Sequence, residues 1–373
     1  MARRSISKKR KVKRAVPAAA ADARSAVSKV ARAAAALRQG KPVLIKDGRA
    51  RPLLAFAVET ATDKSLKALG TEPRLLITHA RARTLKIRLY TPDVVALPLK
   101  KPTAHQLKVI ADPTADLSEP LKGPFAVLRE TLPRAAAASV KLAKLAGLLP
   151  ATIVATPRAP KTAVTIDVAD IENYESESVR TLKILTRARV PLGGAESSEL
   201  VAFRAQDGGP EHYAIVIDAP PTNAPVLTRI HSECFTGDLL GSLKCDCGPQ
   251  LRGAIEKIEQ SGGGILLYLA QEGRGIGLVN KLRAYRMQDQ GFDTIEANER
   301  LGFEPDERLY GVAARMLSLL GYKSVRLLTN NPDKVAALKA AGIAVAERVS
   351  HAFPDNPHNR HYLETKKKAG HLL

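Results

Sequence analysis

Residues 229–250 read RIHSECFTGDLLGSLKCDCGPQ and contain all three cysteines of the chain, Cys234, Cys245 and Cys247. Thiolate sulfur favours zinc, and three protein ligands leave a fourth tetrahedral position for water, as in catalytic sites. Three buried inert cysteines are the alternative, whereas a disulfide would leave one thiol over. Because side chains two residues apart diverge on a helix, a shared metal requires CDCG to be a turn or extended.

The sequence on both sides of this segment alternates between strand and helix patterns. Upstream, residues 199–206 and 212–219 alternate polar with apolar side chains, which predicts two antiparallel strands around a turn at 207–210. Downstream, the predicted elements are helix 249–260, strand 265–269, helix 276–290, helix 306–320, strand 324–329, helix 333–341 and strand 343–349. This order predicts an α/β sheet with crossover helices.

The charge of the chain is distributed unevenly. Residues 1–150 contain 31 of the 58 Lys and Arg residues but only 10 of the 37 Asp and Glu residues, so they carry the whole excess of +21. This asymmetry indicates two units of different role. We expect residues 1–24 to be a basic disordered tail that makes weak, salt-sensitive contact with RNA or other polyanions. Its KKRKVKR run also fits a nuclear localisation signal, and its Arg- and Ala-rich composition fits an organellar transit peptide.

No apolar run reaches the ~18 residues of a membrane span, and no apolar segment follows the basic start as it would in a signal peptide. Cysteines are few. We therefore expect a cytoplasmic protein without membrane contact.

Residues 25–178 are expected to form a first α/β unit. Helical spacing and high alanine content predict helices at 25–38 and 135–150. Strands are predicted at 42–46, 75–80, 85–90 and 151–157. With a second unit at 179–373, the chain is predicted to fold as two α/β domains.

From about residue 225 onward the chain closely resembles GTP cyclohydrolase II, an enzyme of riboflavin biosynthesis. The resemblance rests on the cysteine segment, QEGRGIG (271–277), LGFEPDERLY (301–310) and LLTNNPDKV (327–335). It implies a mixed sheet with flanking helices and a homodimer. It also implies one Zn²⁺ per chain, bound by the three cysteines, and Mg²⁺ on the GTP phosphates. The implied reaction converts GTP to 2,5-diamino-6-(5-phospho-D-ribosylamino)pyrimidin-4(3H)-one, formate and diphosphate.

The resemblance also assigns three catalytic positions. Tyr285 matches a proton donor, Arg308 the nucleophile that takes the α-phosphate as diphosphate leaves, and Asp306 its base. Because a guanidinium is a poor nucleophile, Arg308 could instead clamp the leaving diphosphate by charge. From local sequence alone, Asp306 would cap the predicted helix 306–320, and Tyr285 would be a half-buried helix residue. The helix start would favour phosphate beside Arg308.

Substrate contacts are likewise implied by position. The matching residues are Arg229, Ile230, His231, Ser232, Glu233, Gln250, Glu272, Gly273, Arg274, Thr294, Thr329 and Lys334. Glu272 could accept hydrogen bonds from N1–H and the 2-amino group of guanine. The Gly-rich turn at 271–277 suits close backbone approach. His231 is either a polar contact or a structural histidine.

The first half resembles dihydroxybutanone-phosphate synthase at residues 36–47, 75–82 and 139–155. That family binds Mg²⁺ and a sugar phosphate through an acidic loop after its first strand. Here the corresponding segment, DGRARPLLAFAVET (47–60), begins with one Asp followed by two Arg. The family's later His-Thr-Glu segment is replaced by AAAAS (135–139). We therefore expect a degenerate domain that has lost synthase catalysis.

Other functions fit parts of the sequence. A nucleic-acid-binding or regulatory protein with structural zinc would suit the basic first half, but it requires a fourth Cys or His ligand and no match at Asp306 and Arg308. A bifunctional enzyme would retain the synthase reaction, for which the acidic loop is missing. A cyclohydrolase variant that retains C8 in a formylated pyrimidine remains an alternative.

Overall fold

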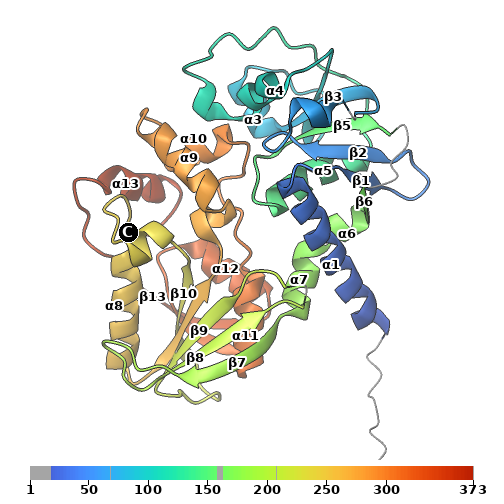
Figure 1. Cartoon of the computed structure of the whole chain (residues 1–373). Helices are drawn as coiled ribbons and strands as arrows, with labels where there is room; N and C mark the ends of the chain where they lie inside the picture. Colours follow the sequence, from blue (N-terminus) through green and yellow to red (C-terminus); the bar gives the residue numbers. More distant parts are fainter. Residues whose placement is uncertain (1–17, 68, 158–162, 207, 373) are drawn as a thin grey trace, which may run out of the picture.

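The computed structural model describes residues 18–372 apart from 68, 158–162 and 207. The described chain forms two α/β units, each with its own sheet (Figure 1). The first sheet has six strands in the order β4-β3-β5-β2-β1-β6, and the second has seven in the order β13-β12-β10-β11-β9-β8-β7. The prediction of two α/β units, the second with a mixed sheet and flanking helices, is confirmed.

The first unit is antiparallel except for its β1–β6 pair. Its strands are β1 (Val43–Lys46), β2 (Leu53–Ala57), β3 (Thr71–Thr78), β4 (Val94–Pro98), β5 (Ala151–Thr156) and β6 (Val164–Asp167). Its helices are α1 (Ala18–Arg38), α2 (Asp63–Leu66), α3 (His79–Thr84), α4 (Ala104–Ala111), η1 (Pro113–Ala115), α5 (Arg134–Leu145) and α6 (Val168–Glu172). Helix α7 (Tyr174–Thr181) leads to the second unit.

Two predictions for the first unit are wrong. Residues 18–24 belong to helix α1, so the expected tail at 1–24 extends too far; residues 1–17 lie outside the described chain. Residues 85–90 form no strand, because Leu85 caps α3 and the backbone N of Ile87 donates to the carbonyl of Ala82. The intervening Lys86 has a positive φ of 58°, which an extended strand does not allow.

The second unit is built on a mixed sheet. Its strands are β7 (Lys183–Arg189), β8 (Ser198–Arg204), β9 (His212–Ile217), β10 (Val226–Ser232), β11 (Gly264–Leu269), β12 (Ser324–Leu328) and β13 (Ala344–Val349). Its helices are η2 (Phe235–Leu239), α8 (Cys247–Gln260), η3 (Glu272–Gly275), α9 (Leu278–Gln288), α10 (Thr294–Arg300), α11 (Gly311–Leu320), α12 (Pro332–Ala340) and α13 (Arg360–Lys368). The predicted antiparallel pair before β10 is confirmed as β8 and β9.

Strand β10 lies between β11 and β12 and is parallel to both. The carboxyl ends of the three strands therefore meet at one edge of the sheet, and the segments that follow them begin there. Ligands of open α/β sheets bind outside this edge. The cysteine segment follows β10, the Gly-rich turn follows β11, and Thr329 follows β12.

The predicted helix 306–320 begins later than expected, at Gly311. Residues 306–310 form a loop, and Asp306 does not cap a helix. The backbone N of Glu307 donates to the carbonyl of Arg274 at 3.0 Å, so this segment pairs with the turn after β11. Arg308 consequently lies in a loop, and the predicted help of a helix N-terminus for phosphate binding does not apply.

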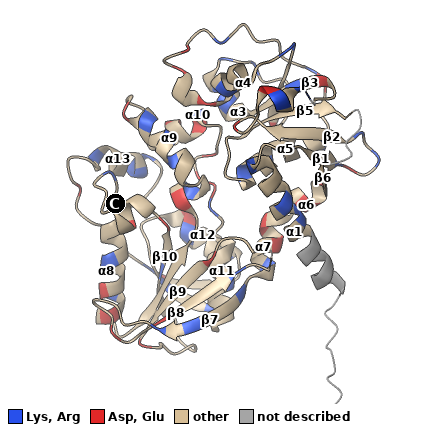
Figure 2. Ribbon diagram, in the orientation of Figure 1, with Lys and Arg blue, Asp and Glu red and all other residues tan. Residues whose placement is uncertain are grey.

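No helix among the described residues is long and apolar enough to cross a bilayer. In Figure 2 the basic residues colour parts of both units, including strand β7 and helix α13. In the described residues, Lys and Arg side chains therefore occur in both units.

Candidate active site

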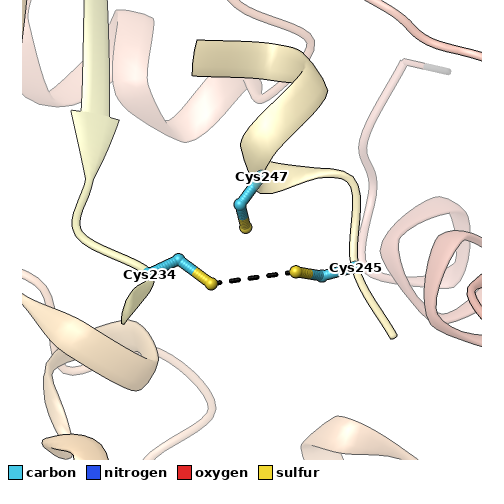
Figure 3. A group of neighbouring side chains, drawn as sticks. All are labelled: Cys234, Cys245 and Cys247. Carbon is cyan, nitrogen blue, oxygen red and sulfur yellow. Dashed lines mark hydrogen bonds between the residues drawn. The ribbon is translucent and has the colours of Figure 1, made fainter. Parts of the chain in front are cut away.

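Three cysteine side chains converge beyond the carboxyl end of β10 (Figure 3). Their sulfur atoms lie within 4.8 Å of one another, and those of Cys234 and Cys245 are 3.7 Å apart. Two sulfurs bound to one zinc at about 2.3 Å lie about 3.8 Å apart in tetrahedral geometry. The cluster therefore fits a zinc ion. Cys245 precedes α8 as predicted, but Cys247 is the first residue of that helix, so CDCG is only partly non-helical.

Gly237 provides the space in which the sulfurs meet. A Cβ at this position would lie 2.8 Å from Sγ of Cys245 and 3.0 Å from Sγ of Cys234. The backbone N of Gly237 also donates to the sulfur of Cys234 at 3.3 Å. A side chain here would occupy the cluster, so the position requires glycine.

The electrostatics of the cluster also suit a cation. Hydrogen bonds from Cys245 and Cys247 lower the pKa of Cys234, and Lys281, whose Nζ is 3.0 Å from that sulfur, lowers it further. The bond with Cys234 raises the pKa of Cys245 to about 11 and raises that of Cys247 as well. Without a metal, three adjacent thiols cannot all ionise. A divalent cation would remove this conflict.

Glu272 joins the turn after β11 to the cysteine segment. Its Oε2 accepts from the backbone N of Phe235 at 2.6 Å. Its Oε1 accepts from Nζ of Lys281 at 2.7 Å and from the backbone N of Gly273 at 2.8 Å. Both oxygens are therefore engaged. The contact of Glu272 with guanine stays a prediction; a carboxylate offers about four acceptor sites, and these three bonds leave one on Oε2.

Tyr285 lies on α9 beside the cluster. Its hydroxyl is 3.4 Å from Oγ1 of Thr236, and it lines a cavity of about 110 Å³ together with all three cysteines. Burial raises the pKa of Tyr285. The phenol therefore keeps its proton at neutral pH, as a proton donor must before it reacts.

Arg308 and Asp306 form an ion pair in the loop before α11. Nε of Arg308 donates to Oδ1 of Asp306 at 2.8 Å. Although burial opposes it, the bond to Asp306 raises the pKa of Arg308. Burial raises the pKa of Asp306, but Arg308 outweighs this and leaves it below its ordinary value. Both groups are consequently charged at neutral pH.

A second cavity, of about 90 Å³, adjoins the first and shares five lining residues with it: Ser232, Cys247, Arg274, Arg308 and Tyr362. Five cationic side chains line it: Arg229, Arg274, Arg308, Lys334 and Lys366. Burial, followed by repulsion from Arg229 and Arg308, lowers the pKa of Lys334 well below 10.5. Burial also lowers the pKa of Arg229 to about 10. Such a cluster suits a polyanion, because phosphate oxygens would relieve the repulsion.

Several buried polar atoms in these cavity walls have no hydrogen-bond partner. They are Nε of Arg229, Nδ1 of His231, Oγ of Ser232 and Nδ2 of Asn298. A buried donor or acceptor without a partner costs free energy, and such groups are rare in folded proteins. Their position around the cavities indicates a polar ligand.

Comparison with known proteins identifies the family. A model of the family described as GTP cyclohydrolase II matches residues 183–350. The curated GTP cyclohydrolase-2 of Azospirillum brasilense is 49% identical over 369 residues, which cover 94% of this chain and 95% of that protein. The chain belongs to the GTP cyclohydrolase II family.

The similarity also reaches into the first unit. The riboflavin biosynthesis protein RibBA of Synechocystis is 45% identical over 255 residues, which cover 63% of this chain and 46% of that protein. Because the second unit makes up only about half of the chain, a match over 63% of the chain must include part of the first unit. Among solved structures, the two-domain 3,4-dihydroxy-2-butanone 4-phosphate synthase RibBX from A. baumannii is 18% identical and covers 87% of this chain and 99% of that one. Its TM-score of 0.33 is too low to establish a shared arrangement.

The structure brings the expected substrate contacts of this cyclohydrolase together. Those that line one of the two cavities are Arg229, His231, Ser232, Glu233, Gln250, Glu272, Gly273, Arg274, Thr294, Thr329 and Lys334. Ile230 differs, because its side chain is fully buried in the core and only its carbonyl faces Lys334, which donates to it at 2.8 Å. His231 is paired through Nε2 with Asp238 at 3.0 Å, which gives it a structural role on that side.

Sequence reasoning missed residues that complete this site. Lys281 and Asn298 lie on α9 and α10, where helical periodicity gives no sign of a contact. Lys366 lies on α13 and donates to Oδ1 of Asp246 at 2.5 Å. Asp246 in turn accepts from Gln250 at 2.6 Å, so α13 is connected to the cysteine segment.

Proposed function

We propose that this protein is a zinc-dependent GTP cyclohydrolase II that hydrolyses GTP to 2,5-diamino-6-(5-phospho-D-ribosylamino)pyrimidin-4(3H)-one, formate and diphosphate. One observation carries the proposal: the three-cysteine cavity adjoins a cavity lined by five cationic side chains. GTP has two chemically different ends. Its purine would lie over the cysteines, and its triphosphate among the cations.

Cys234, Cys245 and Cys247 would bind the zinc ion. Zinc supplies a Lewis acid for the addition of water at C8. Tyr285, which shares the cavity with the cysteines, would donate its proton to the ring nitrogen that separates from C8. Magnesium would accompany the triphosphate and be bound mostly by phosphate oxygens and water.

Arg308 acts in this proposal as a charge clamp on the phosphates when diphosphate leaves. Covalent attack requires Arg308 to lose a proton to Asp306. The ion pair raises the pKa of Arg308 and lowers that of Asp306, so it opposes this transfer. The clamp needs no such transfer, and Asp306 would keep the guanidinium in position.

The homodimer expected from the family finds support in a set of exposed apolar side chains. They are Phe235, Leu239, Leu240 and Leu243 after β10 and Val279 and Leu282 on α9. The two segments are adjacent, since Thr236 contacts Tyr285. Exposed large apolar side chains at neighbouring positions mark protein interfaces. We propose that a second copy of the chain covers them.

We further propose that the first unit has lost synthase activity, because the segment at 47–60 supplies no pair of carboxylates at its start. The enzyme would act in the cytoplasm, where GTP is available and thiols stay reduced. The basic start of the chain would contact polyanions only weakly.

One assay tests the proposal. The purified full-length protein is incubated with GTP and Mg²⁺, the pyrimidine product is identified, and formate and diphosphate are quantified. We expect one formate and one diphosphate per pyrimidine. A formylated pyrimidine without free formate would replace the proposal with the variant reaction, and absence of both products would reject it. Ribulose 5-phosphate, supplied separately, should yield no dihydroxybutanone phosphate.

A further inference from the structure

The first unit contacts the parts of the second unit that carry the candidate catalytic residues. Arg283 of α9 binds Glu59 through both Nη atoms, at 2.9 and 3.2 Å. Nδ2 of Asn280, also on α9, donates to the carbonyl of Gly147 at 3.3 Å. In Figure 1, α9 and α10 lie between the bulk of the second unit and helices α3 and α4, and α10 contacts α3.

These contacts extend into a common apolar core. Met287, Leu301 and Phe303 of the second unit are buried in the same cluster as Ile77 and Leu149 of the first. On its other side, α9 presents Lys281 and Tyr285 to the cysteine cavity. One face of α9 is therefore packed against the first unit, and its other face lines the candidate site.

Lys144 contacts the loop at 304–308, which carries Asp306 and Arg308. It lies on α5 of the first unit, and its Nζ donates to Oε1 of Glu307 at 2.5 Å. The same oxygen accepts from the backbone N of Glu304 at 2.9 Å. Lys144 also lies 5.7 Å from the ring centroid of Phe303. Both partners of the ion pair are about one-fifth exposed, so water screens it only in part.

Glu307 stands between the two residues of the phosphate clamp, Asp306 and Arg308. Its backbone also contacts the turn after β11, since its N donates to the carbonyl of Arg274 at 3.0 Å. A Cβ added to Gly275, which has a φ of +93°, would lie 2.8 Å from the carbonyl carbon and oxygen of Glu307. The loop is thus packed against the turn and also bound to Lys144.

We propose that Lys144 is a positioning residue for the cyclohydrolase reaction. Through Glu307, the first unit fixes the loop at 304–308 and thereby the placement of Arg308 and Asp306 on the phosphates. This assigns a role to a domain whose segment at 47–60 lacks the acidic loop of the synthase family. The inference rests on the proposed function, because Arg308 acts on the phosphates of GTP.

The test is Lys144→Ala in the full-length protein. A catalytic group misplaced by about 1 Å costs up to about a hundredfold in rate, so we expect kcat to fall about ten- to a hundredfold. KM for GTP should change less than about threefold, because the other cations of the phosphate cavity remain. Zinc content should not change.

Lys141→Ala is the matched control. Lys141 lies one turn earlier on the same helix and has its own ion pair, with Glu175 at 3.0 Å, away from the loop. This variant should keep the wild-type kcat. Exchanging the charges in Lys144→Glu with Glu307→Lys should restore part of the rate lost in Lys144→Glu alone. A role of Lys144 that does not act through Glu307 would give no such rescue.

Hydrogen–deuterium exchange provides a readout that does not depend on activity. Amides at 304–308 should exchange faster in Lys144→Ala than in the wild type or Lys141→Ala. If Lys144→Ala does not fold, Glu307→Gln tests the same contact from the other side. Wild-type kcat together with unchanged exchange in the folded variant would overturn the inference. A wild-type protein that releases no formate would reject the proposed function, while the exchange comparison would still decide whether Lys144 fixes the loop.

Discussion

Asp306 binds Arg308 through two different groups of that residue. Its Oδ1 accepts from the side-chain Nε at 2.8 Å and from the backbone N at 3.0 Å, so one carboxylate orients both the guanidinium and the chain that carries it. Arg308→Ala should therefore lower kcat about 10²- to 10³-fold, the usual effect of removing a group that stabilises developing charge. Diphosphate release measures this.

Asp306→Asn separates the two interpretations of Arg308. If Arg308 is a clamp, the amide still orients it, and kcat should fall only about tenfold. If Asp306 must accept a proton, turnover should disappear. Loss of all activity in Asp306→Asn, with Arg308→Ala equally inactive, would favour covalent attack over the clamp.

Gly237 offers a test of the metal site that leaves every sulfur in place. The wild type should contain about one zinc per chain. Gly237→Ala would put a methyl group 2.8 Å from Sγ of Cys245, so it should lose most of its zinc and its activity, as should Cys245→Ser. Metal analysis of the purified variants measures this. Gly241→Ala is a control, since its Cβ would meet no atom within 4 Å, although its φ of +65° adds strain. Full zinc content in Gly237→Ala would contradict the cluster geometry.

The lowered pKa of Lys334 predicts a pH dependence. Only the protonated amine attracts phosphate, so kcat/KM should be highest below its pKa and fall as the pH rises through it. Because burial and the neighbouring cations lower this pKa well below 10.5, the fall should begin at a lower pH than an ordinary lysine allows. Lys334→Arg, whose charge persists, should move the fall to higher pH. An unchanged profile in that variant would assign the fall to another group.

Lys366 should matter for stability as well as for activity. It pairs with Asp246, and the side chains are only 10% and 2% exposed. Removing one partner of a buried ion pair costs about 3–5 kcal/mol, because the other charge stays buried and unpaired. Lys366→Ala should thus lower the melting temperature and the zinc content together. The exposed neighbour Lys367 provides the control substitution, Lys367→Ala, which should change neither.

Leu239 and Leu240 test the proposed dimer. Their side chains are 72% and 64% exposed in the single chain. Replacing both with Asp would place charges in the contact, so sedimentation should show a monomer where the wild type is a dimer. A wild-type protein that sediments as a monomer, or a double variant that stays dimeric, would contradict this surface.

Local sequence patterns were sufficient for most of the second sheet, because its strands are apolar and its helices have regular periodicity. The predicted start of the helix at 306–320 is wrong, because Pro305 and Asp306 are typical of a helix N-terminus but lie in a loop here. There, the contact between Glu307 and the turn after β11 keeps residues 306–310 in a loop. The local sequence does not reveal this contact. The strand predicted at 85–90 is wrong for a local reason, since the end of α3 and a positive φ at Lys86 take its place.

The residues of the candidate site were predictable from motifs rather than from periodicity. The cysteines and the expected nucleotide contacts could be predicted because they occur in motifs, and the structure places all but Ile230 on two adjoining cavities. Lys144 and Lys366 could not be predicted. Each is one lysine among many, and each gains its partner, Glu307 or Asp246, from a segment more than a hundred residues away.

The apolar cluster shared by Phe303, Met287 and the first sheet bears on the history of this protein. A gene that lost the first unit in a single step would encode a second unit with its α9–α10 face open to water, and the product would be prone to aggregate. Selection would therefore retain the first unit whether or not that unit keeps a reaction of its own. On this account, the first unit persists because its neighbour folds against it.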